Sequence, residues 1–176
     1  GNPEGLRAIL ESKLSEGVTT ALPTTLTLPE EQLAESMRSV AAYLEQPDLA
    51  RVPGVHLEGP FINPDCIGGQ NPAYVRPADA EEVMRLGAIA PVKLVTFAVE
   101  MPGALDFASR LRQAGIVPSC GHTAAGYEQM EEAKQAGVVN LTHFCNQMTG
   151  LHHRAVGLVG AGLLDDELFL EMICDR

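Results

Sequence analysis

The 176-residue sequence predicts an α/β fold built from parallel strand–helix units. Stretches with apolar residues at helical spacing alternate with short β-rich runs. Glycine separates a helical stretch from a β-rich run three times, at Gly17, Gly115 and Gly137. A glycine in this place adopts the left-handed conformation that ends a helix. The sequence contains no Asn-Gly hairpin turn, which favours parallel β/α units over antiparallel hairpins.

The alternation defines the expected elements in order along the chain. The first helix should span residues 3–16, the third should lie near 80–89, and two more should end at Gly115 and Gly137. The first helix is expected to bury four apolar residues, Leu6, Ile9, Leu10 and Leu14. Six candidate strands lie between the helices, at about 18–25, 52–58, 93–100, 116–122, 138–144 and 168–174.

The second helix carries a capping-box pattern at its start. Thr27 is followed three residues later by Glu30, so that each side chain could satisfy a free backbone amide of the first turn. Pro29 is tolerated there because the first turn needs no hydrogen bond from its nitrogen. The expected buried face of this helix consists of Leu33, Met37, Val40, Ala41 and Leu44.

Composition excludes several classes of protein. The hydrophobic fraction of 45% is enough for one domain with a core. A net charge of -11 without a run of Lys or Arg argues against a nucleic-acid partner. No stretch reaches the roughly 20 apolar residues of a membrane span, and GNPEGLRAIL lacks a signal-peptide pattern. We therefore expect a cytoplasmic protein, in which the four cysteines are free thiols.

Ionisable side chains stand at the carboxyl ends of three candidate strands. Glu58 closes one strand, His122 closes another, and His143 lies near the end of the next. Right-handed crossovers bring the carboxyl ends of parallel strands to the same side, where active-site groups of parallel barrels converge. One carboxylate and two imidazoles are a common ligand set for a catalytic divalent ion that keeps one position open. The sequence therefore predicts a metal site.

Two alternatives compete with this interpretation. Each histidine taken singly could be a hydrogen-bonded structural residue, and Glu58 could be a solvated carboxylate. Cys120 lies two residues before His122 and Cys145 lies two residues after His143, so these four side chains could form a closed structural zinc site. Neither cysteine–histidine pair has a zinc-finger spacing, which makes the Glu58 set the preferred prediction.

Five stretches resemble one family of known proteins. HLEGPFINPDCIGGQNP, LVTFAVE, GHTAAGY, THFCNQMTGLHHR and GLVGAG occur in this order, and the resemblance extends from GVTTALPTT to ICD. Together they resemble the N-acetylglucosamine-6-phosphate deacetylases of the amidohydrolase superfamily. The combination of HLEGP, GH[ST] and THxxNxM is specific, whereas each motif alone is weak.

The resemblance implies a TIM-like (β/α)8 barrel with a small β-sandwich built from both chain termini. It implies one or two divalent ions, with Glu58, His122 and His143 as metal ligands. The implied reaction is hydrolysis of the acetamide of N-acetylglucosamine 6-phosphate, which gives glucosamine 6-phosphate and acetate. Zinc is the expected ion, and iron, manganese and cobalt are alternatives because they accept the same ligands.

The resemblance also implies residues that bind the substrate. Gly69 and Gln70 match the end of a loop that usually reads Gly-Ala-His or Gly-Thr-His, so a glutamine replaces the family's histidine. Asn146 and Gln147 match a pair that holds the substrate near its phosphate, and Arg154 matches an arginine that approaches the phosphate. Glutamine cannot carry a proton or a positive charge, which favours a changed substrate.

Two further ionisable residues lie on the candidate strands near the predicted site. Glu100 ends its strand as Glu58 does, and it matches a glutamate that would support the site through hydrogen bonds. His56 shares a strand face with Glu58 and is assigned no role.

The family's general base is an aspartate on the last barrel strand, which would lie beyond Arg176. No residue of this chain is therefore predicted to be the catalytic acid or base. We expect residues 1–176 to be a partial barrel domain with about six of eight units, without the β-sandwich and the last strands. Such a fragment should be inactive alone, and the full-length protein should be a homodimer that acts on a small phosphorylated amino sugar. The alternatives are an amidohydrolase that deacylates another N-acyl sugar or amino acid, and a non-catalytic homologue.

Overall fold

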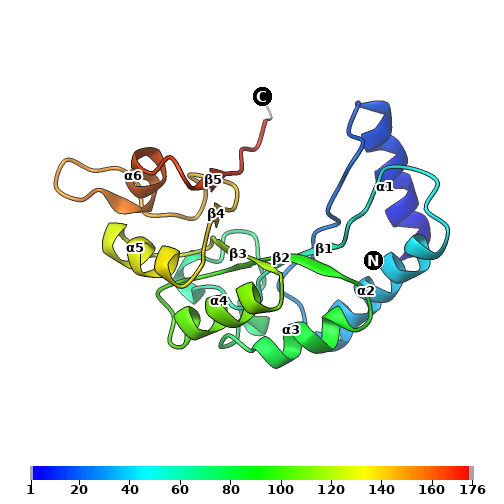
Figure 1. The fold of residues 1–176 in the computed structure, drawn as a ribbon, viewed down its shortest axis with the longest axis horizontal. Coiled ribbons are helices and arrows are strands. Elements are labelled where there is room, and N and C mark those ends of the chain that lie inside the picture. Colours follow the sequence, from blue (N-terminus) through cyan, green and yellow to red (C-terminus); the bar gives the residue numbers. More distant parts are fainter. Residues whose placement is uncertain (1, 175–176) are drawn as a thin grey trace.

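A computed structural model describes residues 2–174 as one curved α/β layer (Figure 1). Its five strands form a parallel sheet in sequence order, β1-β2-β3-β4-β5. The strands are β1 (Val55–Glu58), β2 (Val92–Phe97), β3 (Val117–Cys120), β4 (Asn140–Leu141) and β5 (Phe169–Leu170). The α-helices are α1 (Pro3–Ser15), α2 (Glu30–Glu45), α3 (Ala80–Gly87), α4 (Ala104–Gln113), α5 (Tyr127–Gln135) and α6 (Gly157–Leu164). Two 3-10 helices, η1 (Pro64–Cys66) and η2 (Pro72–Tyr74), lie between β1 and α3.

The elements form a crescent in Figure 1. Helices α3, α4 and α5 lie along its outer side, α1 and α6 lie toward its two ends, and the last described residues rise from β5 on the inner side. The outer helices cover the sheet with a core in which Phe107 of α4 meets Phe61 and Phe97 edge to face. A curved parallel sheet with helices on its outer side agrees with the expected partial barrel.

Five of the six predicted strands are present, and they are shorter than expected. The first candidate strand, residues 18–25, forms only isolated parallel bridges, from Thr20 to Arg51 and from Thr24 to His56. Pro23 interrupts this segment because a proline nitrogen has no hydrogen to donate to a sheet. The segment nevertheless follows the edge of β1, since the carbonyl of Pro23 accepts a hydrogen bond from the backbone amide of His56.

Glycine ends three of the helices as the sequence predicts. Gly17, Gly115 and Gly137 have φ angles of 90°, 74° and 107°, in the left-handed range. The buried face expected for α1 is wrong in part, because Ile9 and Leu14 are 60% and 40% exposed. Helix α1 lies at one end of the crescent and packs mainly on α2, so the sheet does not cover the rest of its apolar surface.

The buried face of α2 agrees better with the expectation. Leu33, Met37 and Val40 are buried, whereas Ala41 and Leu44 are only partly buried at the edge of the core.

The predicted capping box at the start of α2 is wrong. The helix begins at Glu30 after Pro29, and no side chain caps it. Thr27 is buried, its hydroxyl has no hydrogen-bond partner among the described residues, and its side chain packs against Gly59. The backbone amide of Thr27 instead donates to the side chain of Gln70, which lies 43 residues further along the chain. This tertiary contact replaces the local cap.

Two other expectations from composition can be compared with the structure. All four cysteines are free thiols, as predicted. Among the described residues, no helix is both long enough and apolar enough to cross a bilayer.

A buried ion pair holds the loop between β1 and α3. Arg76 donates from Nε and Nη2 to the carboxylate of Glu82, at 2.9 and 2.5 Å, and Glu82 is only 3% exposed. Nη1 of Arg76 donates to the carbonyl oxygens of Leu28 and Tyr74. One guanidinium thus joins α3, the loop and the segment before α2.

Removal of this guanidinium should destabilise the fold. We expect Arg76→Met to lower the free energy of unfolding by about 3 kcal/mol, because it leaves the carboxylate of Glu82 buried without a partner. Chemical denaturation measures the change. The control Arg85→Met breaks an exposed ion pair with Glu30 and should cost much less, because solvent screens exposed charges. Equal losses in the two variants would show that the buried pair has no special role.

Candidate metal centre

The parallel register brings three strand ends to one level. Glu58 is paired with Thr96 of β2, Phe97 of β2 is paired with Cys120, and Cys120 is paired with Leu141 of β4. Because the strands are parallel and level, the residues that follow them emerge at one edge of the sheet. This is where the chain places its carboxylate and its two imidazoles.

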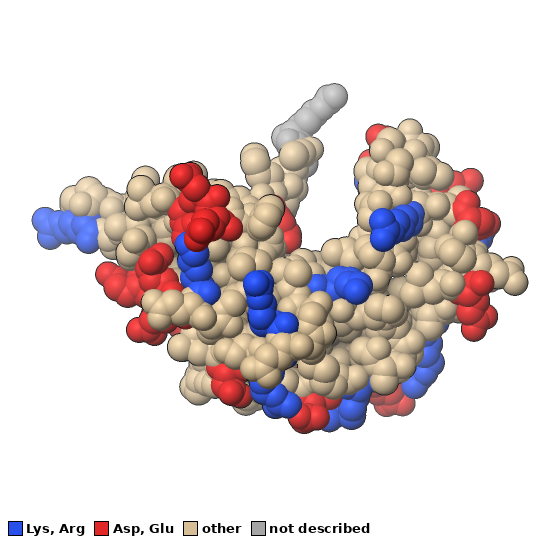
Figure 2. All heavy atoms as spheres, in the orientation of Figure 1, with Lys and Arg blue, Asp and Glu red and all other residues tan. Residues whose placement is uncertain are grey.

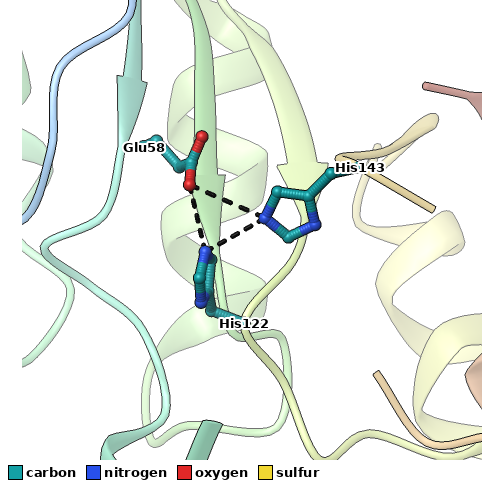
Figure 3. A group of neighbouring side chains, drawn as sticks. All are labelled: Glu58, His122 and His143. Atoms are coloured by element: carbon teal, nitrogen blue, oxygen red, sulfur yellow. Dashed lines mark hydrogen bonds and ion pairs between the residues drawn. The ribbon is translucent and has the colours of Figure 1, made fainter. Parts of the chain in front are cut away.

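The side chains of Glu58, His122 and His143 point toward one another at this edge (Figure 3). Oε1 of Glu58 lies 3.0 Å from Nε2 of His122 and 3.6 Å from Nε2 of His143. The two Nε2 atoms are 3.0 Å apart. The three side chains therefore form the predicted cluster, and each offers one ligand atom within 4.8 Å of the others.

The backbone turns sharply at both histidines. His122 and His143 each lie two residues beyond a strand, with φ angles of 49° and 38°. Residues other than glycine rarely adopt this left-handed backbone conformation. Where they do, it is often at a functional site. The expectation that His122 closes its strand is wrong, because β3 ends at Cys120 and the chain turns before the imidazole.

The backbone at position 121 lies so close to its neighbours below the two imidazole rings that only glycine fits there. A Cβ atom on Gly121 would lie 2.7 Å from Cγ2 of Thr96 and 3.2 Å from Cβ of Thr142, with Cε1 of His143 at 3.8 Å. The hydroxyls of Thr96 and Thr142 are 2.6 Å apart and fully buried, so this layer has little room to move. Gly121 therefore lets His122 and His143 approach each other above the sheet.

A hydrogen bond to the backbone determines which ring nitrogen of His122 carries the hydrogen. Nδ1 of His122 lies 2.9 Å from the carbonyl oxygen of Cys66, which can only accept, so Nδ1 carries the hydrogen. In the neutral imidazole, Nε2 then presents a lone pair toward Oε1 of Glu58, which is also an acceptor. Two acceptors at 3.0 Å repel each other unless a proton or a metal ion lies between them. This donor set fits a divalent cation.

The charges of the cluster reinforce one another. Burial opposes the negative charge of Glu58, but the two imidazoles outweigh it when they carry the shared proton, because His122 and His143 then donate hydrogen bonds to the carboxylate and hold its pKa well below the ordinary value. The same contact with Glu58 raises the pKa of His143 against the effect of burial. Glu58 is therefore ionised across the physiological range and attracts a cation to this point.

The alternative zinc site with two cysteines is not formed. Cys120 is fully buried in the core, where desolvation raises the pKa of its thiol to about 12, and Cys145 is exposed. Among the described residues, the only group with ligand atoms close enough for one ion is Glu58, His122 and His143. The left-handed turn at His122 is the physical reason, because it breaks the alternation that would place Cys120 on the same face.

Known proteins match nearly the whole of this chain. It is 36% identical over 176 residues to an N-acetylgalactosamine-6-phosphate deacetylase of Escherichia coli O157:H7, covering 98% of this chain and 47% of the relative. It is 35% identical over 175 residues to an N-acetylglucosamine-6-phosphate deacetylase of Lysinibacillus sphaericus, covering 98% and 45%. No protein-family model matches.

Solved structures agree with these relatives. The N-acetylglucosamine-6-phosphate deacetylase of Thermotoga maritima superimposes with a TM-score of 0.86 at 38% identity, covering 96% of this chain and 46% of that chain. An aspartate-to-alanine mutant of the Mycobacterium smegmatis deacetylase, in complex with N-acetyl-D-glucosamine-6-phosphate, has a TM-score of 0.80 at 31% identity, covering 88% and 40%. The chain is homologous to the N-acetylglucosamine-6-phosphate deacetylases. It spans slightly less than half the length of these relatives.

The first pair of predicted substrate-binding residues, Gly69 and Gln70, is in the loop after β1. Gln70 is buried, and its Nε2 donates to Oε1 of Glu58 at 3.0 Å. It is therefore not an ordinary loop glutamine. Gly69 is exposed and has open space around it. Gln70 is thus in direct contact with a predicted metal ligand, and Gly69 precedes it in the chain.

The second pair follows His143 in a loop over the same edge. Asn146 is exposed, and its Nδ2 donates to the carbonyl oxygen of His143 at 3.2 Å. Gln147 is also exposed, has a φ of 51°, and accepts a hydrogen bond from the amide of Thr123 at its carbonyl oxygen. The loop is thus tied to both histidine-bearing turns.

Arg154 is not brought to the cluster. It is exposed, and the hydrogen bonds that the structure gives it run to His152 and His153 in its own loop. A contact between Arg154 and a phosphate group stays a prediction.

Glu100 supports the centre as the resemblance implies. Its carboxylate accepts hydrogen bonds from Nδ2 of Asn63, from the hydroxyl of Thr123, and from the amide of Ala124. The backbone amide of Asn63 donates in turn to the carbonyl oxygen of His122. Glu100 thus ties the loop after β1 to the turn that carries His122.

His56 is a buried, hydrogen-bonded residue below the centre. Its Nε2 lies 2.7 Å from the hydroxyl of Thr96, and its Nδ1 lies 3.3 Å from the hydroxyl of Thr24. Desolvation lowers the pKa of His56 to about 4, so the imidazole is neutral. It joins β1 to β2 beneath Glu58.

Sequence reasoning missed two backbone groups of the centre. The carbonyl of Cys66 orients His122, and the amide of Thr27 binds Gln70. Every residue type except proline carries both groups, so no side-chain pattern could have indicated them.

Replacement of both cysteines tests the ligand set. The double variant Cys120→Ala/Cys145→Ser should keep the metal content of the wild type, because neither thiol reaches the cluster. Glu58→Gln should lose most of the bound metal, because the charged ligand is gone. Elemental analysis of the purified full-length gene product measures both. Metal loss in the double variant with normal content in Glu58→Gln would support the cysteine site instead.

A methyl group at position 121 should disturb the centre without replacing a ligand. We expect Gly121→Ala to lower the affinity for a divalent ion by about tenfold or more, since it displaces the layer below His143. Titration with a chelator as competitor measures the affinity. Gly87→Ala is the control, because a Cβ there meets open space. Unchanged affinity in Gly121→Ala would show that the layer is not rigid.

Proposed function

We propose that the protein is a divalent-metal-dependent deacetylase that hydrolyses N-acetylglucosamine 6-phosphate to glucosamine 6-phosphate and acetate, a reaction of amino-sugar breakdown. One observation carries the proposal. Glu58, His122 and His143 converge at one edge of a parallel sheet, in a chain that aligns with named deacetylases over nearly its whole length. The chain covers less than half of those relatives, so the activity is proposed for the full-length protein.

Glu58, His122 and His143 would hold the ion. Zinc fits two imidazoles and one carboxylate best, and iron, manganese and cobalt are accepted by the same ligands. A bound divalent ion supplies Lewis-acid activation of a water molecule and of the amide carbonyl. Glu58 contributes a negative charge that its neighbours stabilise, and the carbonyl of Cys66 keeps Nε2 of His122 free of hydrogen.

Substrate contacts are assigned by position. Gly69 is exposed next to Gln70, so it leaves space for a sugar beside Glu58. Asn146 and Gln147 are exposed on the loop that follows His143. Arg154 remains the candidate for the phosphate, because its planar guanidinium can donate to two phosphate oxygens at once.

The proton-transfer group is proposed to lie outside the described residues. The resembling family uses an aspartate on its last barrel strand for this step, and none of residues 2–174 is proposed for it. We infer that residues 1–176 supply part of a barrel domain, and that the full-length protein is a homodimer.

A second candidate differs only in the sugar. The relative from Escherichia coli O157:H7, at 36% identity, is named for N-acetylgalactosamine 6-phosphate. The two sugars differ in the orientation of one hydroxyl, which changes hydrogen bonds and leaves the acetamide unchanged. The same ion site would therefore serve both reactions.

Acetate release by the full-length gene product tests the proposal. We expect turnover of N-acetylglucosamine 6-phosphate that greatly exceeds turnover of the unphosphorylated sugar, loss of activity with a chelator, and recovery with a divalent ion. Glu58→Gln should lower kcat/KM by at least about a hundredfold, whereas Glu11→Gln on the exposed face of α1 should not.

The outcomes separate the candidates. A higher kcat/KM for N-acetylgalactosamine 6-phosphate would select the second candidate. Activity that survives both metal removal and Glu58→Gln would refute the metal-dependent mechanism. No acetate from either sugar phosphate would refute the deacetylase function.

A further inference from the structure

Gln70 makes one hydrogen bond at each end of its side-chain amide. Oε1 accepts from the backbone amide of Thr27 at 2.7 Å, and Nε2 donates to Oε1 of Glu58 at 3.0 Å. The residue is only 7% exposed, and its own backbone amide donates to the carbonyl of Ile67. Its amide is therefore held between the segment before α2 and a metal-ligand carboxylate.

The orientation of this amide follows from its neighbours. A backbone N–H can only donate, so the atom of Gln70 that faces Thr27 must be the oxygen. The nitrogen then faces Glu58, whose ionised carboxylate can only accept. Both contacts are satisfied in this orientation, and both would be repulsive after a flip of the amide.

The contact restrains the softest torsion of Glu58. The terminal carboxylate torsion of glutamate is broad, so an isolated Glu58 would rotate its two oxygens freely. Nε2 of Gln70 binds the same oxygen that faces His122 and His143. As a neutral donor, Gln70 leaves the negative charge of Glu58 available for a cation.

We propose that Gln70 is a positioning residue that holds the Glu58 carboxylate in its ion-binding orientation, with the backbone amide of Thr27 as its anchor. The inference deepens the proposed function and rests on the ion site assigned there. It gives Gln70 a role through Glu58, in place of a direct contact with the sugar. It also connects the segment before α2 to the metal centre. The connection is made by the backbone amide of Thr27 and not by its hydroxyl.

Two variants of Gln70 test the inference in the full-length gene product. Gln70→Met keeps the length of the side chain but can neither donate to Glu58 nor accept from Thr27. We expect its affinity for Zn²⁺ to fall by between about 10-fold and 100-fold, with the stoichiometry unchanged. Gln70→His carries one donor and one acceptor nitrogen when neutral, and should recover most of the affinity. Gln113→Met, at an exposed position of α4, is the matched control.

Two readouts distinguish positioning from substrate binding. Isothermal titration with Zn²⁺ gives the affinity, and the visible spectrum of the Co²⁺-loaded protein reports the geometry of the ligands. Gln70→Met should change the Co²⁺ spectrum, while its KM for the sugar phosphate at saturating metal stays near that of the wild type. Gln70→His decides the question if Gln70→Met does not fold.

Each result has a defined meaning. Wild-type Zn²⁺ affinity and an unchanged Co²⁺ spectrum in Gln70→Met, with a raised KM, would overturn the inference and make Gln70 a substrate contact. Failure of Gln70→His to recover any affinity would also overturn it. A wild-type protein that releases no acetate, together with the predicted loss of Zn²⁺ affinity in Gln70→Met, would refute the proposed function and leave the inference intact.

Discussion

The candidate site depends on one electrostatic constraint, the convergence of atoms that repel one another without a cation. The carbonyl of Cys66 takes the only hydrogen of neutral His122, so Nε2 presents its lone pair to the carboxylate of Glu58 at 3.0 Å. Nε2 of His143 approaches the same point. Only positive charge between them, as a proton or a metal ion, turns this repulsion into attraction. The fold has to hold the groups close enough for that charge to be shared.

Two layers of hydrogen bonds provide the necessary rigidity. Below the centre, the hydroxyls of Thr96, Thr142 and Ser119 are linked in one chain across β2, β3 and the turn after β4, and Thr96 continues it to His56 of β1. Above the sheet, Glu100 and Gln70 tie the loop after β1 to the neighbouring segments. Strand register sets the height of the ligands, and these two layers limit their rotation. A buried polar network of this kind is stable because its members are paired.

The described residues would supply only part of the proposed deacetylase site. In the proposed reaction, the described residues supply a fixed negative charge, two imidazole ligands and the groups that orient them. Proton transfer would fall to a residue outside them. Gly69 and Asn146 are exposed, unlike the buried centre, and in the proposed function this surface would accept and release the sugar. Selection between sugars that differ at one hydroxyl can therefore change there while the ion site stays constant.

The sequence by itself determined the order of helices and strands, the glycine residues that end three helices, and the three predicted ligands. These features depend on periodicity and backbone preference within a few neighbours, so a linear pattern carries them. Only the tertiary structure decided that Thr27 binds Gln70 and does not cap α2, that Gln70 reaches Glu58, and that Ile9 remains exposed. The first two contacts join residues 43 and 12 positions apart. Their energies depend on where the folded chain brings backbone groups together, which no local pattern encodes.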